Sequence, residues 1–155
     1  MTVGTNAGTT LGVSATLPGS HDFAGFDALS FTTVGEITDL GEFGREYALI
    51  THNPVDTRAT QKFKGSYNEG AMNLSLGLDT DDAGQIIMKA ASASDNDYAF
   101  KVTIGSSLDE YFFLGKVMSW KVGPGGVDNL VGATCSIELT SSSAGLGIVE
   151  NLSTA

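Results

Sequence analysis

The chain has 155 residues, the length of one domain that buries roughly two-thirds of its unfolded surface. It carries 18 acidic and 8 basic side chains, a net charge of −10, so its surface repels phosphate backbones and DNA binding is disfavoured. Its single cysteine excludes an intramolecular disulfide, and its twenty glycines, well above the average usage of roughly 7%, predict many turns and short strands.

The start of the chain has no targeting signal that we can identify. Residues 1–19 lack the basic region and the continuous apolar run of a signal peptide, and no window approaches the length of a membrane span. We therefore expect a chain that is made and folded in a reducing cytosol and does not insert into a membrane.

The first half of the chain is expected to hold four strands separated by two long connections. The strand patterns run over 9–17, 30–38, 46–51 and 60–67. Residues 18–29 predict a surface loop anchored by Phe23 and Phe26, and residues 39–60 predict a longer excursion that contains the Asn53–Pro54 turn signal. A loop of that length in a compact domain is usually functional or becomes ordered by a partner.

Residues 79–84, DTDDAG, look like the start of an EF-hand calcium loop. Such a loop needs an oxygen ligand at its fifth position and a glutamate at its twelfth, and here these are Ala83 and Ala90. A helix accounts for the same residues without gaps. One apolar stripe at helical spacing is formed by Ala83, Ile86, Ile87, Ala90 and Ala91.

The three aspartates fit the start of that helix better than they fit an ion. Asp79 is expected to cap it, and Asp81 and Asp82 are expected to lie in its first turn, where the helix dipole favours negative charge. We predict one helix over about 80–92, with Gln85 and Lys89 facing outward, and no metal site.

Three segments of the second half show the clearest alternation of apolar and polar side chains, which indicates strands packed on one face. They run over 71–78, 98–104 and 131–140. A further strand at 111–122 is apolar on both faces over part of its length, and Gly115 is expected to mark a bend or bulge. The GPGG turn at 123–126 is expected to join it, as an antiparallel hairpin, to the strand after Val127.

No catalytic constellation is apparent. His21 and His52 lie in predicted loops, and Cys135 lies on the apolar face of a strand, where a buried structural thiol is expected. Asp109 and Glu110 are adjacent, so their side chains point to opposite faces of a strand, and a solvated turn is the expectation. We predict no catalytic, cofactor-binding or metal-binding residues.

Arg58, Lys62 and Lys64 form the only basic cluster. Three interpretations remain open: a solvated strand face, pairing with acidic groups on a neighbouring copy, or a nucleic-acid contact, which the overall charge disfavours. The acidic run that matches the cluster is Glu36, Asp39, Glu42 and Glu46.

The order of these elements resembles the tail tube subunit of long-tailed phages, the group typified by the phage lambda major tail protein. The resemblance covers about residues 7–148, from AGTTLGVS and FTTVGEITDLGEFG through the two strands before the helix to the block at 98–145. It consists of the order of the elements together with short similar sequence segments. The chain departs from the family's pattern in the first loop and after residue 146.

The resemblance, together with the strand pattern, implies a mainly β fold: an antiparallel sandwich or partial barrel flanked by the helix. We expect a single tail-tube domain over 1–155, with its core at about 8–140 and mobile ends at 1–7 and 141–155. The resemblance implies rings of six subunits that stack into a tube, with the loop at 39–60 reaching adjacent subunits and DNA passing through the channel without specific binding. The implied partners are further copies, the tail tip or initiator, and the tape-measure protein; the implied location is the virion, after assembly in the host cytoplasm.

A channel wall needs a strand face that is polar without holding DNA, and an acidic ring would repel DNA from it. The candidate lumen-facing residues are small or acidic: Asn73, Ser75, Thr134, Ser136 and Glu138. The candidate inter-subunit contacts are charged residues of the long excursion and the strand after it: Glu42, Arg45, Glu46, Arg58, Lys62 and Lys64.

Three other functions stay in view. The nearest is the tube of a contractile tail or of a type VI secretion-like system. A carbohydrate-binding or adhesin-like β-sandwich would need a cluster of exposed aromatic side chains, whereas Trp120 lies in an apolar strand. A small hydrolase is the least favoured, because no catalytic constellation supports it.

Overall fold

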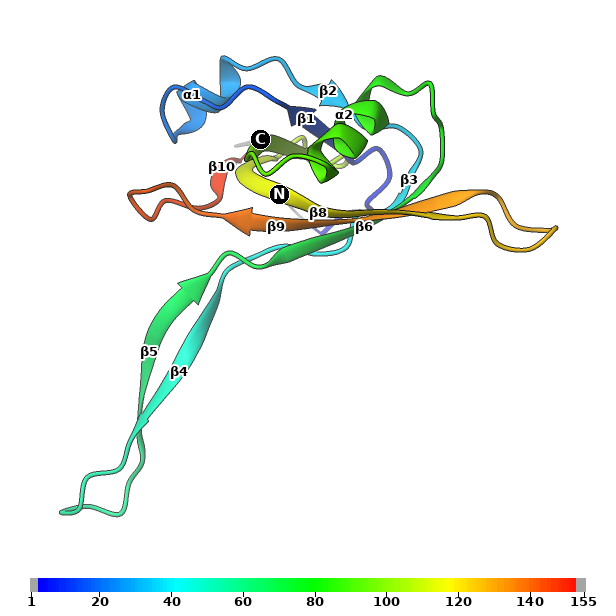
Figure 1. Cartoon of the computed structure of the whole chain (residues 1–155). Helices are drawn as coiled ribbons and strands as arrows, with labels where there is room; N and C mark the ends of the chain where they lie inside the picture. The colour runs from blue at the N-terminus through cyan, green and yellow to red at the C-terminus, as the bar shows by residue number, and fades with distance from the viewer. Residues whose placement is uncertain (1–2, 153–155) are drawn as a thin grey trace.

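The computed structural model describes residues 3–152 as a curled antiparallel sheet with two helices on one side and a long hairpin projecting away from it (Figure 1). The predicted mainly β fold is confirmed. The helices are α1 (Phe23–Asp27) and α2 (Ala83–Ser92). The strands are β1 (Thr10–Ser14), β2 (Thr32–Thr33), β3 (Ile37–Asp39), β4 (Glu46–His52), β5 (Gln61–Asn68), β6 (Ala71–Gly77), β7 (Tyr98–Thr103), β8 (Glu110–Gly123), β9 (Gly132–Thr140) and β10 (Val149–Asn151).

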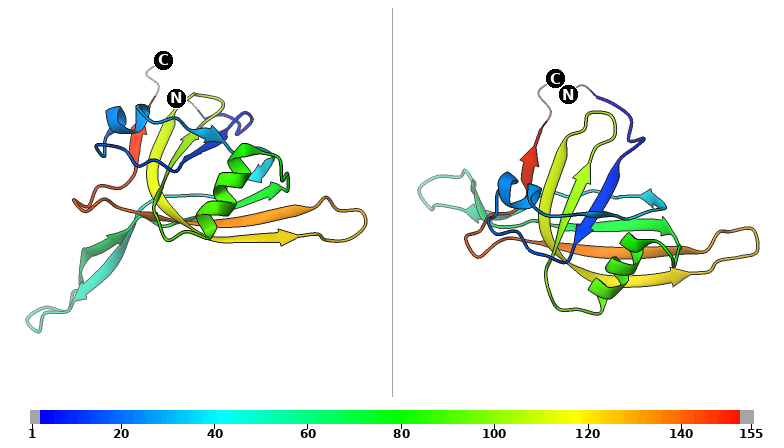
Figure 2. Two further views of the ribbon diagram at one scale, coloured as in Figure 1. Left: turned by 45° about the horizontal axis from the view of Figure 1, so that its top comes forward. Right: turned by 90° about the horizontal axis from the view of Figure 1, so that it is seen from above.

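The main sheet has the strand order β2-β1-β7-β8-β9-β6-β3, and β10 pairs with β8 beside this path. β8 is the strand that joins the two halves, because its first residues pair with β7 and β10 and its later residues pair with β9. Figure 2 shows β8 curving, so that the sheet closes part of the way toward a barrel. β4 and β5 form a separate two-stranded ribbon.

The core lies inside this curl and under α2. The apolar side chains of β6 and β9 predicted to share one face are buried there, among them Leu74, Cys135 and Ile137. They pack with Phe100 of β7 and Phe113 of β8, whose rings stack with centroids 5.5 Å apart. Each fully buried side chain of this kind contributes about 1.5–3 kcal/mol, so the alternation seen in the sequence is what closes the curl.

The strand predicted over 30–38 is divided into two short strands, β2 and β3. Glu36 between them has a φ of +61°, in the left-handed region that breaks an extended strand. The N–H of Gly35 donates to the Asp82 carboxylate at 3.0 Å instead of joining the sheet. The strand predicted over 9–17 is also shorter, since β1 ends at Ser14.

The register shift in β8 lies at Met118, between Val117 and Ser119, and not at Gly115. Gly115 is paired on both sides, with Tyr98 and with Leu139. A Cβ at position 115 would lie 2.8 Å from the Ile137 side chain. Glycine is therefore required there for close packing of the strands, not for a bulge.

The helix α2 begins at Ala83, three residues later than the predicted cap implied. Asp82 caps it, with its carboxylate accepting from the Gln85 N–H at 3.0 Å, whereas Asp79 accepts from the Asp81 N–H in the turn before it. Asp81 and Asp82 therefore precede the first turn instead of lying in it. The predicted helix is confirmed, and its predicted cap is wrong.

The buried face of α2 is rotated from the predicted stripe. Gly84, Gln85, Met88 and Ala91 are buried, while Ile86 is exposed. The rotation follows from Gly84, because a Cβ there would lie 2.3 Å from the carbonyl oxygen of Thr33, so this side of the helix packs directly onto backbone. The prediction that Gln85 faces outward is wrong.

Residues 18–29 contain a short second helix, α1, which was predicted as loop. The Asp22 carboxylate caps it, accepting from the Gly25 N–H at 2.8 Å and from the Ser20 hydroxyl at 2.9 Å, and these two bonds lower the pKa of that carboxyl. Phe26 is fully buried and stacks on Phe112, so it anchors the segment as predicted, whereas Phe23 is partly exposed.

The predicted hairpin between β8 and β9 is present, with Gly125 in its turn at a φ of +69°. Within the C-terminal stretch 141–155, residues 149–151 form β10, which pairs with residues 110–112 of β8. Residues 1–2 and 153–155 lie outside the described part of the chain. No helix among residues 3–152 is long and apolar enough to cross a membrane.

Candidate assembly surfaces

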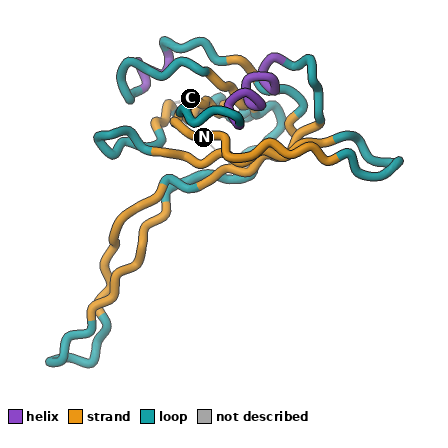
Figure 3. The backbone as a smooth tube through the Cα atoms, viewed as in Figure 1, coloured by secondary structure: helices purple, strands orange, loops and turns teal. Residues whose placement is uncertain are grey.

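The ribbon of β4, β5 and the turn between them, residues 46–68, is here called the arm. Within the described chain its strands pair only with each other, and the arm projects away from the main sheet (Figures 1 and 3). The excursion predicted over 39–60 is thus largely one side of a hairpin, and the Asn53–Pro54 signal lies in its turn.

The arm exposes large side chains on both faces. One face, here called the lysine face, carries Tyr47, Leu49, Thr51, Lys62, Lys64 and Tyr67. The other face pairs Ile50 with Phe63, which are 51% and 53% exposed, and Leu49 on the lysine face is 66% exposed. A two-stranded hairpin is marginally stable in water on its own, so an arm that leaves apolar groups bare on both sides is suited to being covered by a partner.

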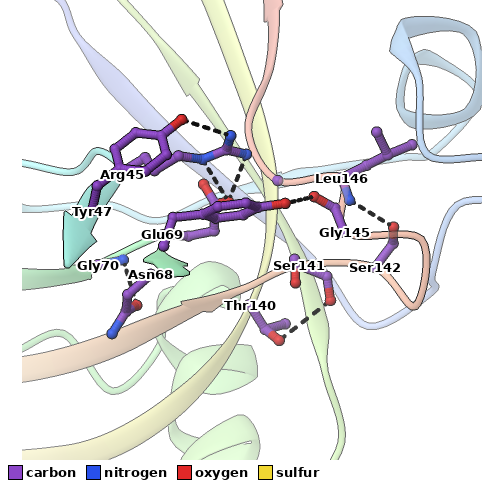
Figure 4. Close-up of polar contacts among 12 residues, drawn as sticks. Arg45, Tyr47, Asn68, Glu69, Gly70, Thr140, Ser141, Ser142, Gly145 and Leu146 are labelled. Carbon is purple, nitrogen blue, oxygen red and sulfur yellow. Dashed lines mark hydrogen bonds and ion pairs between the residues drawn. The ribbon is translucent and has the colours of Figure 1, made fainter. Parts of the chain in front are cut away.

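A cluster at the base of the arm fixes its direction (Figure 4). Both Nε and Nη2 of Arg45 donate to one carboxylate oxygen of Glu69, at 3.0 and 2.8 Å, and Glu69 is only 4% exposed. The guanidinium lies 4.0 Å from the centre of the Tyr67 ring. The Tyr47 hydroxyl and the Glu69 carboxylate together raise the pKa of Arg45, so this guanidinium stays charged at any ordinary pH.

Glycines bring the two sides of the base together. Gly70 has a φ of +89°, and a Cβ there would lie 2.6 Å from the carbonyl oxygen of Gly44. No other residue fits this combination of backbone conformation and close approach without strain. The arm therefore leaves the sheet through a narrow, defined crossing, not through a loose linker.

The C-terminal segment closes over the same cluster. The Tyr67 hydroxyl donates to the carbonyl oxygen of Gly145 at 2.8 Å, and Gly147 lies directly against the Glu69 carboxylate. The carbonyl oxygen of Gly147 also lies 2.5 Å from Nε2 of His21, which belongs to the loop before α1. Residues 145–147 therefore connect the base of the arm to the α1 region.

The predicted inter-subunit residues fall into two groups. Glu46, Lys62 and Lys64 lie on the strands of the arm and Arg58 lies in its turn, so the structure brings these four together on one projection. The Lys64 ammonium lies 4.6 Å from the centre of the Tyr47 ring. Glu42 and Arg45 lie before the arm, Glu42 exposed and Arg45 paired with Glu69 in the same chain.

The predicted lumen-facing residues lie on one face of the main sheet, opposite the core. The register places Asn73 opposite Ser136 and Ser75 opposite Thr134, and Glu138 lies next along β9 on the same face. The sequence did not assign two lysines of β8 to this face. The first half of β8 is apolar on both sides, so its sequence shows no alternation that would indicate which residues face which way. Lys116 lies opposite Glu138, and Lys121 lies opposite Thr134. This open face is thus polar and of mixed charge, and not mainly acidic.

An apolar groove of about 500 Å³ runs between α2 and the later part of β8. Its walls include Leu78, Ile86, Ala90, Ala93, Trp120 and Val122. Ile86 and Val122 are each about half exposed, at 54% and 50%. This feature, here called the α2–β8 groove, is where the rotation of α2 leaves part of its predicted apolar stripe uncovered.

The residues considered for chemistry are not assembled into a site. Cys135 is buried, and burial raises the pKa of its thiol to about 12. Asp109 is 3% exposed, which corrects the predicted solvated position, and Leu108 before it has a φ of +61°, so the turn directs the chain inward. Glu110 forms an ion pair with Lys101 at 2.9 Å. Among residues 3–152, no group of three His, Cys, Asp or Glu side chains is placed to hold a metal ion.

Comparison with known proteins gives a fold but no family. No family model matches the chain, and no curated protein sequence matches it. The chain is similar to a protein in the cryo-EM structure of the anti-feeding prophage (AFP) baseplate, solved with six-fold symmetrisation. The TM-score is 0.66 at 7% identity, over 100% of this chain and 99% of the other.

It is also similar to the subunit of the SPP1 tail tube, with a TM-score of 0.58 at 14% identity, over 95% of this chain and 78% of the other. A type six secretion system protein shows a weaker likeness, with a TM-score of 0.45. The AFP neighbour is part of a baseplate, and the SPP1 neighbour is part of a tail tube. The chain has a tail-tube-like fold.

Proposed function

We propose that the chain is a structural subunit of a bacteriophage tail tube, and that it assembles into stacked rings around a channel that conducts DNA. The rings are proposed to have six subunits and to be located in the virion. Their proposed partners are a tail tip or initiator complex and a tape-measure protein.

The observation that carries the proposal is the arm. It projects from a tail-tube-like fold, it pairs with nothing else in the described chain, and it exposes apolar groups on both faces. A contact of one surface with a different surface on the next copy is heterologous, and heterologous contacts build rings or open fibres. The candidate inter-subunit residues Glu46, Arg58, Lys62 and Lys64 all lie on the arm.

The face of the main sheet opposite the core supports the same function. Asn73, Ser75, Thr134 and Ser136 are short, uncharged side chains, and the charged groups beside them are of both signs. Such a face offers DNA no continuous row of cations, so DNA would pass it without being retained. We therefore propose this face, with Glu138, as the channel wall.

Negative-stain microscopy of the concentrated protein tests the proposal. Wild-type protein is expected to form hollow tubes of constant diameter, with or without an initiator complex. Changing Ile50 and Phe63 to aspartate would place two charges on one face of the arm and is expected to abolish tubes while the circular dichroism spectrum stays unchanged. A wild-type protein that remains monomeric under all conditions, initiator complexes included, would contradict the proposal.

A second candidate is a ring in the baseplate region of such a particle or of a related contractile or secretion-like system. The specific observation that favours it is the AFP baseplate protein, which this chain covers from end to end. The length of the assembly separates the two candidates, because a baseplate ring stops after one or a few layers and a tube subunit continues to add them.

A further inference from the structure

We propose that the α2–β8 groove is the site that receives the lysine face of the arm from a second copy of the chain. This inference rests on the proposed function, since it names the surface on which the arm docks. Three observations carry it: apolar side chains on both surfaces, an unpaired strand edge beside the groove, and the opposite charges of the arm and of the segment around α2.

The groove is an apolar surface that no other part of the described chain covers. Ile86 of α2 and Val122 of β8 are half exposed and both line the groove, together with Trp120 of β8. Leu49 is the most exposed apolar side chain on the strands of the arm, and it lies at the centre of the lysine face. Covering these groups together removes apolar surface from water on both partners.

A strand edge runs along the groove. Residues 110–115 of β8 pair with β7 on this edge, but from Lys116 to Gly123 the only partner of β8 in the described chain is β9, on the opposite edge. An edge of this length is a template for an added strand. The arm consists of two strands whose outer edges are likewise unpaired, so either can lie along it.

The arm and the segment around α2 differ in charge, whereas the lining of the groove itself holds one acidic and one basic residue, Asp79 and Lys89. The arm, residues 46–68, holds three basic and two acidic side chains, a net charge of +1, whereas the rest of the chain holds 16 acidic and 5 basic side chains, a net charge of −11. The segment around α2, residues 79–97, holds five aspartates and Lys89, a net charge of −4. The arm is thus attracted to this side of another copy and not to another arm.

The occupant has to come from a second copy because of where the arm points. Figure 1 shows the arm leaving the main sheet on the side away from α2, and the cluster of Arg45 and Glu69 holds it in that direction. The arm therefore cannot reach the groove of its own chain, and the two are separate surfaces of one copy. Their contact repeats from copy to copy, as a growing assembly requires.

Trp120 is the only tryptophan of the chain and lines the groove, so its fluorescence reports directly on occupancy. On assembly of the wild-type protein, Trp120 emission is expected to shift to shorter wavelength and to become less accessible to acrylamide. The double variant Lys62→Glu/Lys64→Glu is expected to need on the order of tenfold more protein for half-maximal assembly, from the loss of two exposed ion pairs, and to lose the shift at the original concentration.

Charge reversal in the groove separates docking there from a general charge effect. Adding Asp81→Lys/Asp95→Lys to the double variant is expected to restore assembly, since both aspartates are exposed and lie just before and just after α2, the helix that forms one wall of the groove. The matched control Asp27→Lys/Asp128→Lys changes the net charge equally at exposed positions outside the groove and is expected not to restore it.

The possible failures are distinguishable. Tubes in which Trp120 stays as accessible as in the monomer, or in which the control reversal restores assembly equally well, would overturn this inference and leave the proposed function standing. A Trp120 shift caused by an unrelated basic peptide but not by assembly would also overturn it. A wild-type protein that never assembles would overturn both.

Discussion

The Gln85 side chain holds three backbone segments together. Its amide nitrogen donates to the carbonyl oxygens of Gly35 and Gly77, at 3.0 and 2.9 Å, and its oxygen accepts from the Asp79 N–H at 3.0 Å. Gln85 is 2% exposed, so every polar atom of its amide has a protein partner in place of water. This one side chain ties α2 to the connection between β2 and β3 and to the end of β6.

Replacing Gln85 with alanine is expected to lower the free energy of unfolding by about 1–3 kcal/mol, because three buried backbone groups lose their partner. Chemical denaturation followed by circular dichroism measures the change. Gln61→Ala on the exposed arm is the matched control and is expected to stay within about 0.5 kcal/mol of wild type. Equal effects of the two substitutions would contradict the role assigned to Gln85.

Cys135 is expected to be unreactive in the folded protein. Burial raises the pKa of its thiol to about 12, so at pH 8 neither thiolate nor access is available, and a thiol reagent should react only after denaturation. The sign of the pH effect follows from linkage. Above pH 9 the unfolded thiol loses its proton while the folded one keeps it, so the stability of the fold should fall as pH rises from about 9 toward 12.

Fast labelling of Cys135 under native conditions would contradict its buried position. The pH effect has its own control in Cys135→Ser, whose hydroxyl does not titrate in this range. That variant should lack the thiol's contribution to the loss of stability above pH 9, whatever its stability at neutral pH.

These single positions show where reasoning from sequence stops. A glutamine in a helix is counted as polar and is therefore expected to face outward. Nothing in the neighbouring sequence indicates that three backbone groups, 6 to 50 positions away, need its amide as a hydrogen-bond partner. Cys135, by contrast, was predictable, since it occupies an apolar position in a strand that alternates over its whole length.

The arm is an element whose own contacts do not fix its direction. The ion pair of Arg45 with the nearly buried Glu69, the close crossing of Gly44 and Gly70, and the bond from Tyr67 to Gly145 are what hold it to the sheet. Its stability is therefore expected to be local, and lower than that of β8 and β9.

Glu69→Gln removes the charge of this cluster while keeping its shape. Amide hydrogen exchange over residues 46–68 is expected to become about tenfold faster, which corresponds to a loss of about 1.4 kcal/mol, while exchange in β9 stays the same. Glu110→Gln breaks the more exposed pair with Lys101 and is expected to leave the arm unchanged. Uniform acceleration across the whole chain would show instead that Glu69 supports the core.

Strands that pack on one face were predictable, and strands that exist because of distant partners were not. β6, β7 and β9 carry their alternation in the sequence. β2 and β3 are two and three residues long, and β10 forms only beside β8, so their boundaries depend on the fold. The rotation of α2, which opens the groove, likewise depends on the contact of Gly84 with Thr33.

The distribution of charge over the molecule bears on the passage of DNA. The net charge of −10 is concentrated away from the open sheet face, where Glu138 lies among Lys116 and Lys121, and Lys116 also pairs with Asp97. The prediction of an acidic wall came from the net charge and from the small or acidic residues of two strands, and it did not include the lysines that β8 places on the same face.

Tubes of the double variant Asn73→Lys/Ser136→Lys are therefore expected to retain double-stranded DNA that wild-type tubes do not. The two lysines would lie opposite each other on the proposed channel wall, next to the existing cations. Co-sedimentation with DNA measures retention, and raising the salt concentration should release it, since phosphate contacts weaken with salt. Equal retention by wild-type tubes would contradict the assignment of this face to the channel.

The course of β8 has a mechanical consequence. The same fourteen residues take part in both halves of the sheet, line the α2–β8 groove on one side, and carry Lys116 and Lys121 on the other. A force applied at the groove would therefore be transmitted along a single continuous backbone to the opposite face of the sheet. The bulge at Met118 is the place on this path where the pairing of β8 with β9 is interrupted.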